Sequence, residues 1–279
     1  MKIEGAIETP PMMHVDWPRH RVQLCYLWRH RRPANLQTPT RFSELVQVRK
    51  LTDRDPRMPP RLDKVAVKQI VAHELGQDFL TPTIWSGRYL PKLTNVRCAS
   101  ILKARHGCNQ SRVLSTPPSP AQWQRLRRLG KTWAKAPYGE WLDEWAYNSV
   151  PRGLLMEPLL GDGTALPIDY KVFVFGGCAT HVQVHMGRGT RHRWVLHDRQ
   201  WRKLIPSQPD SPARPSCLTE MLAAAERLAA GFSFARIDFF EVEGKPRFAE
   251  YSFYPGSGLD PFEQDWIDFE LGKLWLAAL

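Results

Sequence analysis

Apolar and polar residues alternate over residues 234–254, which is the pattern of a β-hairpin with one buried face on each strand. The first strand places on one face Phe234, Arg236, Asp238 and Phe240. The second strand places on one face Phe248, Glu250 and Ser252. A three-residue loop at 243–245 sets Asp238 opposite Glu250 and Arg236 opposite Ser252, and any odd-length loop keeps both acids on one face. The pattern predicts two carboxylates, a guanidinium and a hydroxyl side by side.

Other apolar runs and periodic segments predict the remaining elements. Short apolar runs predict strands over 98–103, 153–160, 169–175 and 180–186. Helical periodicity predicts helices over 42–51, 63–75, 119–133 and 218–230 and a last helix around 266–274. Asp63, Ser119 and Ser216 are the expected start signals of three of them, and Gly76 is an expected end signal. The basic and aromatic stretch from Trp17 to Arg32 is interpreted either as a short helix lying on the domain or as a basic patch facing an anionic partner.

Composition narrows the class of protein. Among the 279 residues, 43% are hydrophobic and eleven are tryptophan, which excludes a disordered chain. The 39 Lys and Arg against 28 Asp and Glu give a net charge of +11, which favours an anionic partner: nucleotide, nucleic acid, acidic glycan or anionic membrane. The five cysteines are isolated, so neither a disulfide framework nor a zinc site is predicted. Without a signal-peptide core or an apolar run of ~18–20 residues, we expect a soluble cytoplasmic protein, with peripheral membrane association left open.

Three groups of residues suggest nucleotide chemistry. Lys103 ends a predicted strand beside a loop with one glycine, Lys171 follows Asp169 by two positions in another strand, and the hairpin supplies the acids. Lysines inside apolar strands need an anionic partner, and Mg²⁺ in nucleotide sites takes one or two carboxylates together with phosphates. The pattern therefore predicts a nucleoside triphosphate site with Mg²⁺. The alternative interpretation of the hairpin is a solvated polar face or an ion-pair network of Arg236 with Asp238 and Glu250.

The order of these residues resembles the ATP-grasp fold and, more closely, its TupA-like (teichuronopeptide biosynthesis) amidoligase branch. The resemblance runs from about Asn35 to the C-terminus, through Asn35–Glu44, Asp63-Lys64, Ile101–Lys103, His106-Gly107, Glu144-Trp145, Met156–Leu159, Asp169–Lys171, Arg236–Asp238 and Glu250–Gly256. It implies an α+β fold in which two α+β lobes with antiparallel sheets hold ATP between them. It also implies a helical or irregular N-terminal extension over 1–62 and an ATP-grasp domain over 63–279, with lobes of about 63–160 and 161–279.

The resemblance also implies roles for individual residues. Lys103 and Lys171 would bind nucleotide phosphates, with His106, Gly107 and Asp169 beside them. Glu157, Pro158 and Leu159 would line the adenine pocket. Asp238 and Glu250, with Ser252, would hold Mg²⁺. Arg236 and Arg188, together with Lys171, would act on the transferred phosphate or the acyl group.

Two positions depart from the family pattern. The phosphate loop reads His-Gly-Cys-Asn, where a second glycine or small residue is usual. Ser252 stands where many ATP-grasp proteins have Asn, a stronger metal ligand.

These observations support three functional hypotheses. The first is an ATP-dependent carboxylate–amine ligase that forms an amide through an acylphosphate. Its substrates in this hypothesis are an acidic glycan or peptide precursor of the cell surface and an amine acceptor, and its partners include a peripheral contact with membrane-bound glycan machinery. In this hypothesis Arg191, His192 and Arg193 are contacts for the acidic substrate or simply a solvated basic loop. The second is a glycosyltransferase-type enzyme of polysaccharide biosynthesis. The third is a basic nucleic-acid-binding module, which the inward-facing acids disfavour because they repel phosphate unless a metal is bound.

Overall fold

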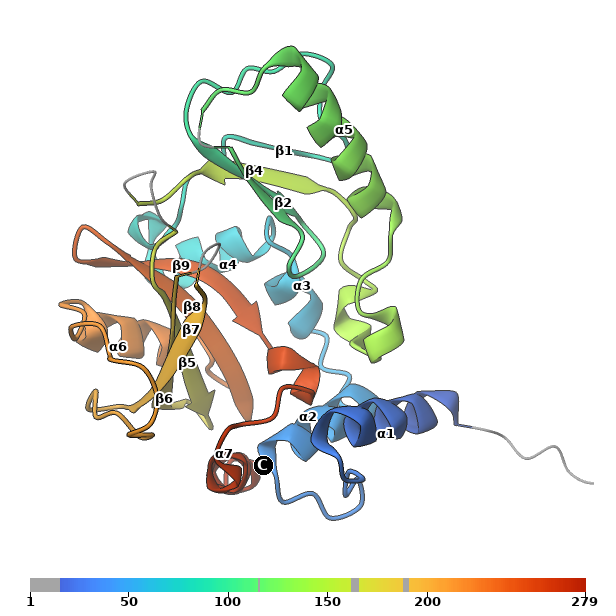
Figure 1. The fold of residues 1–279 in the computed structure, drawn as a ribbon, viewed down its shortest axis with the longest axis vertical. Helices are drawn as coiled ribbons and strands as arrows, with labels where there is room; N and C mark the ends of the chain where they lie inside the picture. The colour runs from blue at the N-terminus through green and yellow to red at the C-terminus, as the bar shows by residue number, and fades with distance from the viewer. Residues whose placement is uncertain (1–15, 115, 162–165, 188–190) are drawn as a thin grey trace, which may run out of the picture.

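Two antiparallel sheets form the framework of the protein in a computed structural model that describes residues 16–114, 116–161, 166–187 and 191–279 (Figure 1). The smaller sheet has the strand order β1-β4-β2-β3, with β1 Trp85–Gly87, β2 Ser100–Ala104, β3 Ser111–Leu114 and β4 Leu154–Pro158. The larger sheet has the order β7-β6-β5-β8-β9, with β5 Asp169–Phe175, β6 Cys178–Met186, β7 Arg193–Asp198, β8 Phe234–Val242 and β9 Lys245–Ser252. The predicted α+β class with antiparallel sheets is confirmed.

The small lobe is one sheet covered by one helix. Helix α5, Pro120–Lys135, begins at Ser119, whose hydroxyl accepts the N–H of Gln122 as the sequence predicts. Its apolar stripe, including Trp123 and Leu126, packs on Leu102, Leu154 and Met156 of the sheet. This packing uses one face of β2 and β4. The other face of the same strands carries Ile101, Lys103, Leu155 and Glu157.

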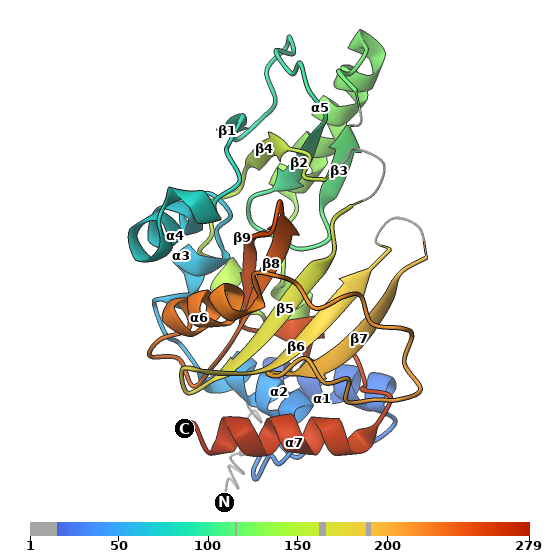
Figure 2. The ribbon, with the colours of Figure 1, turned by 90° about the vertical axis from the view of Figure 1, so that its left-hand side faces the viewer.

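The large lobe surrounds β5, whose residues are all buried. Helix α6, Leu218–Leu228, covers one face of the sheet, and α1 Trp17–His30, α2 Phe42–Thr52 and α7 Asp265–Leu276 lie at the end of the molecule remote from the small lobe (Figure 2). The remaining helices are α3 Met58–Leu62, α4 Val67–Leu75 and the 3₁₀ turns η1 Gln77–Phe79, η2 Glu140–Leu142, η3 Trp145–Tyr147 and η4 Pro255–Gly258. No helix of the described ranges is both long and apolar enough to cross a bilayer.

Aromatic packing joins α2 to the large sheet. The Phe42 ring lies 5.8 Å from Phe173, 5.0 Å from Phe234 and 5.5 Å from Trp275 of α7. Phe173 and Phe234 stand on the same sheet face as Lys171 and Asp238. One face of the sheet is therefore an aromatic core at one end and charged at the other.

The β8–β9 hairpin pairs Asp238 and Arg236 with the predicted residues, but its turn differs from the prediction. Asp238 pairs with Glu250 and Arg236 with Ser252, as expected. The loop has two residues, Glu243 and Gly244, both with positive φ (52° and 71°), as in a type I′ turn. The predicted three-residue loop is therefore wrong, and a bulge at Ala249 restores the register that the even-length loop would otherwise shift. Because of the bulge, Phe248 pairs with Phe239 and leaves the face of Glu250, contrary to prediction.

Several predicted helix starts shift. The Trp17–Arg32 stretch is a helix, and it buries Val22, Tyr26 and His30. Helix α4 begins at Val67 rather than at Asp63, whose carboxylate instead accepts the N–H of Val65 and pairs with Arg105. Ser216 lies one residue before the N-cap of α6 and bonds to Glu241. In both shifts, the side chain expected to cap the helix forms a hydrogen bond elsewhere: Asp63 with Val65 and Arg105, and Ser216 with Glu241.

Candidate functional site

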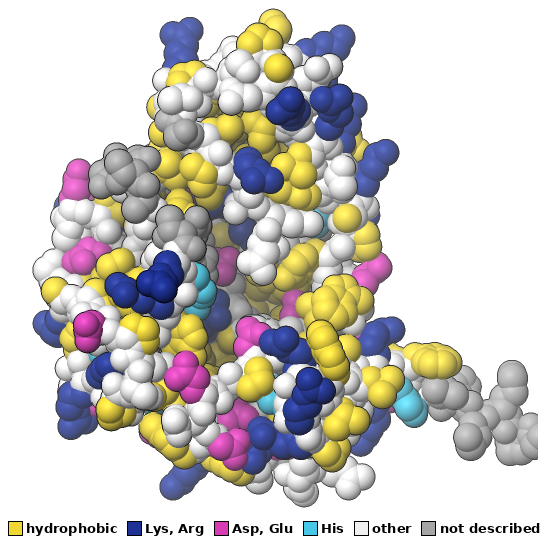
Figure 3. Space-filling model, viewed as in Figure 1, with side chains coloured by type: hydrophobic (Ala, Val, Ile, Leu, Met, Phe, Trp, Pro, Cys, Tyr) yellow, Lys and Arg dark blue, Asp and Glu magenta, His cyan; other side chains and the backbone are white. Residues whose placement is uncertain are grey.

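A cavity of about 620 Å³ lies between the charged faces of the two sheets. Figure 3 shows the hollow between the two lobes, with acidic and basic side chains inside it. Its size is typical of a site for a nucleotide-sized ligand. Eleven of the residues predicted for the site line it: Lys103, Gly107, Glu157, Pro158, Leu159, Asp169, Lys171, Arg236, Asp238, Glu250 and Ser252.

On the large sheet, Asp238 is the centre of a buried ionic cluster. Its Oδ1 accepts Nε–H of Arg236 at 2.7 Å, and its Oδ2 accepts Nη2–H of Arg236 at 2.7 Å and the Lys171 ammonium at 2.5 Å. Lys171 also lies 2.8 Å from Asp169 Oδ2. Burial alone raises the pKa of Asp238, but Arg236 and Lys171 outweigh it, so the pKa is lower than that of an ordinary aspartate. The cluster is therefore ionised and internally compensated.

On the small sheet, Glu157 holds two lysines. Its Oε2 lies 2.7 Å from Lys103 Nζ, and its Oε1 lies 2.5 Å from Lys68 Nζ. Burial raises the pKa of Glu157, and the two ammonium groups lower it by more. Lys68 is positioned further by Thr81 O at 2.7 Å and Thr83 Oγ1 at 2.8 Å. These contacts orient two cations on the cavity wall opposite Lys171.

Glu250 is the accessible acid of the site. Its side chain is 30% exposed and lies 3.7 Å from Arg236, whereas that of Asp238 is 1% exposed. The described part of the chain contains no cluster of three or more His, Cys, Asp or Glu able to hold a metal ion. The pair Asp238 and Glu250 with Ser252 nevertheless fits Mg²⁺, which takes few protein oxygens where phosphates and water complete the shell.

Of the two residues predicted for the site in the loop between β2 and β3, one lines the cavity and the other does not. Gly107 lines the cavity, and its carbonyl accepts the Lys64 ammonium at 2.6 Å. His106 is buried outside the cavity lining, where Nε2 lies 3.1 Å from Trp133 O and Nδ1 accepts the N–H of Gly153. Asn109 adopts φ 58°, a left-handed conformation that asparagine tolerates. The loop therefore makes the turn for which the family pattern uses a second small residue.

Other residues of the site were given no role from the sequence. Lys64, which belongs to the Asp63-Lys64 element of the resemblance, and Lys68 both line the cavity. Their spacing of four positions is the one signal that they share, but Lys64 precedes helix α4, so they do not share a helical face. His185 lines the cavity opposite Asp169 in the sheet ladder, and its Nδ1 lies 2.9 Å from His192 Nε2. Arg188, predicted to contact phosphate or carboxylate, lies outside the described residues.

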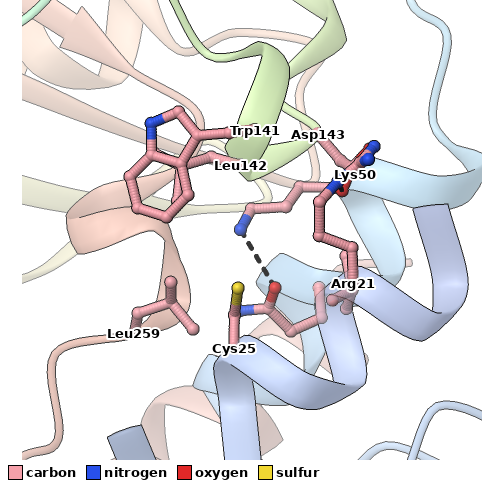
Figure 4. Close-up of a pocket in the computed structure, with 9 residues that line it drawn as sticks. Arg21, Cys25, Lys50, Trp141, Leu142, Asp143 and Leu259 are labelled. Carbon is pink, nitrogen blue, oxygen red and sulfur yellow. Dashed lines mark hydrogen bonds and ion pairs between the residues drawn. The ribbon is translucent and has the colours of Figure 1, made fainter. Parts of the chain in front are cut away.

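A second, much smaller pocket adjoins the cavity beside α1, α2 and η2 (Figure 4). Lys50 crosses it and donates to Gln47 Oε1 at 3.0 Å and to Ser257 O at 2.6 Å. Burial lowers the pKa of Lys50 to about 8. Arg21 and Asp143 close one side as an ion pair. The contacts of Lys50 hold η4 against α2. In the sequence, η4 follows Glu250 by a few residues.

Comparison with known proteins gives one match over most of the chain. A sequence model of the family described as TupA-like ATPgrasp matches residues 44–276. No curated protein sequence matches the chain. Among solved structures, the D-alanine–D-alanine ligase of Helicobacter pylori is 12% identical, with a TM-score of 0.46 over 86% of this chain and 67% of that one.

Two further ligase structures are similar at the same level. The D-alanine–D-alanine ligase of Bacillus anthracis, complexed with ATP, is 13% identical, with a TM-score of 0.45 over 78% of this chain and 64% of that one. The L-amino acid ligase of Bacillus licheniformis is 13% identical, with a TM-score of 0.42 over 75% of this chain and 49% of that one. The present chain thus spans 64% of the first ligase and about half of the second. The assignment rests on the sequence model, and by that match the chain belongs to the TupA-like ATP-grasp family.

Proposed function

We propose that the protein is an ATP-dependent carboxylate–amine ligase that works in the cavity between its two sheets. The observation that carries the proposal is the opposition of two ionic clusters across that cavity. One is the Asp238 cluster of the large sheet. The other is Glu157 of the small sheet, with Lys103 of the same sheet and Lys68 of α4. Cations on both walls, with Asp238 and Glu250 on the wall of the large sheet, suit a triphosphate with its metal ion.

The chain supplies a contact for each part of the nucleotide. Lys103 and Lys171, aided by Lys68, bind phosphate oxygens in exchange for their carboxylate partners. Glu157, Pro158 and Leu159 form the edge of the adenine pocket at the end of β4. Asp238, Glu250 and Ser252 hold Mg²⁺, which when bound neutralises charge on the phosphates.

The reaction follows from the placement of charge. A substrate carboxylate oxygen attacks the γ-phosphorus, the bond to the β–γ bridging oxygen breaks, and ADP leaves with that electron pair. Arg236, with Arg188 as a second contact, stabilises charge on the transferred group. The amine then attacks the acyl carbon, phosphate leaves, and the amine loses a proton as the amide forms. The loop at 106–111 and the 3₁₀ turn at 255–258 would exclude water from the acylphosphate.

The substrates we propose are an acidic glycan or peptide precursor and an amine acceptor. The support is the net charge of +11 and the basic stretch Arg191-His192-Arg193. His192 contacts His185, which lines the cavity, so this stretch begins close to the site. An acidic polymer entering there meets cationic groups before it reaches the phosphate-binding lysines.

The first test is the thermal midpoint of the protein with and without Mg²⁺ and ATP. A ligand at about a hundredfold excess over its Kd stabilises the native state by roughly 2.7 kcal/mol. Lys103→Met is expected to lose most of this shift, and Glu250→Gln is expected to lose its dependence on Mg²⁺. Both side chains are partly exposed, so the variants keep their fold.

Matched controls are Lys131→Met and Glu243→Gln, which change the same residue types at exposed positions away from the cavity. Both should shift with Mg²⁺ and ATP as the unmodified protein does. A shift with a nucleotide sugar and none with ATP would contradict the ligase and support the glycosyltransferase hypothesis. Once ATP binding is established, ADP release in a screen of acids and amines identifies the substrates.

A further inference from the structure

The net positive charge of this protein comes from one segment of the small lobe. Residues 79–139 contain eleven of the 39 Lys and Arg and no Asp or Glu. The other 28 Lys and Arg stand in the rest of the chain with all 28 Asp and Glu. The whole net charge of +11 therefore equals the charge of this segment, which forms β1, β2, β3 and α5.

Most of this charge lies on the outside of the small lobe. Eight of the eleven basic residues are exposed, and we call them the basic face: Arg88, Lys92, Arg97, Arg112, Arg125, Arg128, Lys131 and Lys135. None of the eight forms an ion pair with any described residue. The other three are engaged, since Lys103 pairs with Glu157, Arg105 with Asp63, and Arg127 donates to Leu90 O. Figure 3 shows the basic side chains around the outline of the upper lobe.

The contributing segments are adjacent. The loop from Arg88 to Arg97 is fixed on α5, because Trp123 Nε1 donates to Pro91 O at 3.1 Å and Leu90 packs in the core beneath that helix. On α5, Arg128, Lys131 and Lys135 follow at intervals of three and four, which places them on one side of the helix. The loop and the helix thus form a continuous cationic surface.

An apolar residue stands out of that surface. Leu93 is 81% exposed, more than any other large hydrophobic side chain of the described residues, and it lies between Lys92 and Arg97. Tyr89, 41% exposed, lies beside Arg88 in the same loop. Exposed leucine and tyrosine flanked by cations suit the boundary between lipid headgroups and acyl chains. The leucine gains no apolar burial from a hydrated polyanion such as a soluble acidic polysaccharide or the phosphate backbone of a nucleic acid.

We propose that the basic face of the small lobe docks on an anionic lipid membrane, with Leu93 entering the interfacial layer. The cations supply the attraction to anionic headgroups, and the leucine supplies apolar burial. This docking is independent of the proposed ligase activity. The small lobe also forms one wall of the cavity, so docking would hold the cavity close to the membrane surface.

The test is co-sedimentation of the full chain with vesicles of phosphatidylglycerol and phosphatidylcholine, and with vesicles of phosphatidylcholine alone. We expect binding to the anionic vesicles only, weakened by salt because exposed charges are screened. The variant Arg125→Glu/Arg128→Glu/Lys131→Glu should bind at least tenfold more weakly. Leu93→Ser, which keeps every charge, should bind severalfold more weakly.

The matched control is Arg214→Glu/Lys245→Glu/Lys273→Glu, which makes the same change in net charge at exposed positions of the large lobe. It should bind as the unmodified protein does, and the thermal midpoints of all variants verify folding. Equal loss in the two triple variants would overturn the proposal, because net charge alone would then explain the binding. An absence of binding to anionic vesicles at low salt would also overturn it. A third contrary outcome is that DNA or polygalacturonate displaces the protein from vesicles while Leu93→Ser binds vesicles as tightly as the unmodified protein.

Discussion

Asp238 carries the electrostatic balance of the site in the absence of a ligand. It is fully buried and, among the described residues of the cluster, it is the one carboxylate that accepts hydrogen bonds from both Lys171 and Arg236. These two cations also lie near Asp169 and Glu250, respectively. Glu157 does the same for Lys68 and Lys103. Each lysine proposed to bind phosphate therefore has a carboxylate partner that an incoming nucleotide must replace. Nucleotide affinity will reflect an exchange of partners rather than the pairing of free charges.

Asp238→Asn is expected to lower the free energy of unfolding by about 3–5 kcal/mol, because removal of one partner leaves buried charge uncompensated. Glu250→Gln, half-exposed and 3.7 Å from Arg236, should cost less than about 1 kcal/mol. Urea unfolding without nucleotide measures both. Similar losses in the two variants would show that Asp238 does not balance the cluster.

Side chains on predicted strands could be placed from the sequence, and those on helices could not. Alternation in strands fixes the face of Lys103, Lys171, Asp238 and Glu250 once the strands are recognised. Lys68 lies on a helix, where a lysine is usually solvated, and only its approach to Glu157 in three dimensions gives it a role. The orientation of His106 away from the cavity depends on α5, which the local sequence does not position.

At the scale of elements, α7 and the entry to α2 make a close backbone contact at Gly272. A Cβ at this position would overlap the carbonyl oxygen of Thr40 and lie 2.9 Å from the backbone nitrogen of Phe42. Neither atom can move without shifting α2. At Gly130 of α5, the nearest atom would be the terminal Cδ1 of Leu154, which can rotate.

Gly272→Ala should therefore destabilise the protein by about 3 kcal/mol, at the upper end for overpacking. Gly130→Ala should change stability by less than about 1 kcal/mol, since the better helix propensity of alanine offsets a small side-chain shift. Chemical denaturation of the two variants tests the difference. If Gly130→Ala were the more damaging change, the contact between α2 and α7 would not be the tighter one.

The elements themselves were largely predictable because their periodicity is regular. Strand β5 has the predicted extent, helix α5 ends two residues beyond the predicted position 133, and the pairing of Asp238 with Glu250 across the β8–β9 hairpin is as expected. Short elements such as β1, β3 and η2 were not predicted, since three or four residues contain too little pattern. The bulge at Ala249 leaves no local signal either, because it depends on the strand opposite.

At the scale of the whole molecule, charge and composition can be read from the sequence, but periodicity alone does not show that the charged faces of the two sheets lie opposite each other. Contacts between distant segments, such as Phe42 with Phe234, build the core of the large lobe. They also bury titratable groups that stand in ordinary strand positions. His181 of β6 and His197 of β7 are two of these.

These histidines make stability depend on pH. Burial lowers the pKa of each to about 4 from an ordinary value near 6.5. The unfolded chain then binds more protons between pH 6.5 and 4, so their stabilising contribution is complete above pH 6.5 and lost as the pH falls toward 4. The loss amounts to about 3 kcal/mol per histidine.

His181→Gln should lessen the loss of stability between pH 7 and pH 4 by about 3 kcal/mol, as measured by unfolding free energies across this range. His73→Gln, at an exposed position, is the matched control and should leave the slope unchanged. An identical slope in His181→Gln and the unmodified protein would contradict the assignment.

Because of the bulge at Ala249, the length of the hairpin turn does not by itself determine the face on which Asp238 and Glu250 lie. A three-residue turn without the bulge and a two-residue turn with it both set Asp238 opposite Glu250. During divergence, an insertion beside Gly244 and a deletion at Ala249 would thus compensate each other and leave the carboxylate pair in place. An ungapped alignment of such a relative would still match Glu250 correctly, but it would displace residues 245–248 by one position and so match side chains that lie on opposite faces of the strand.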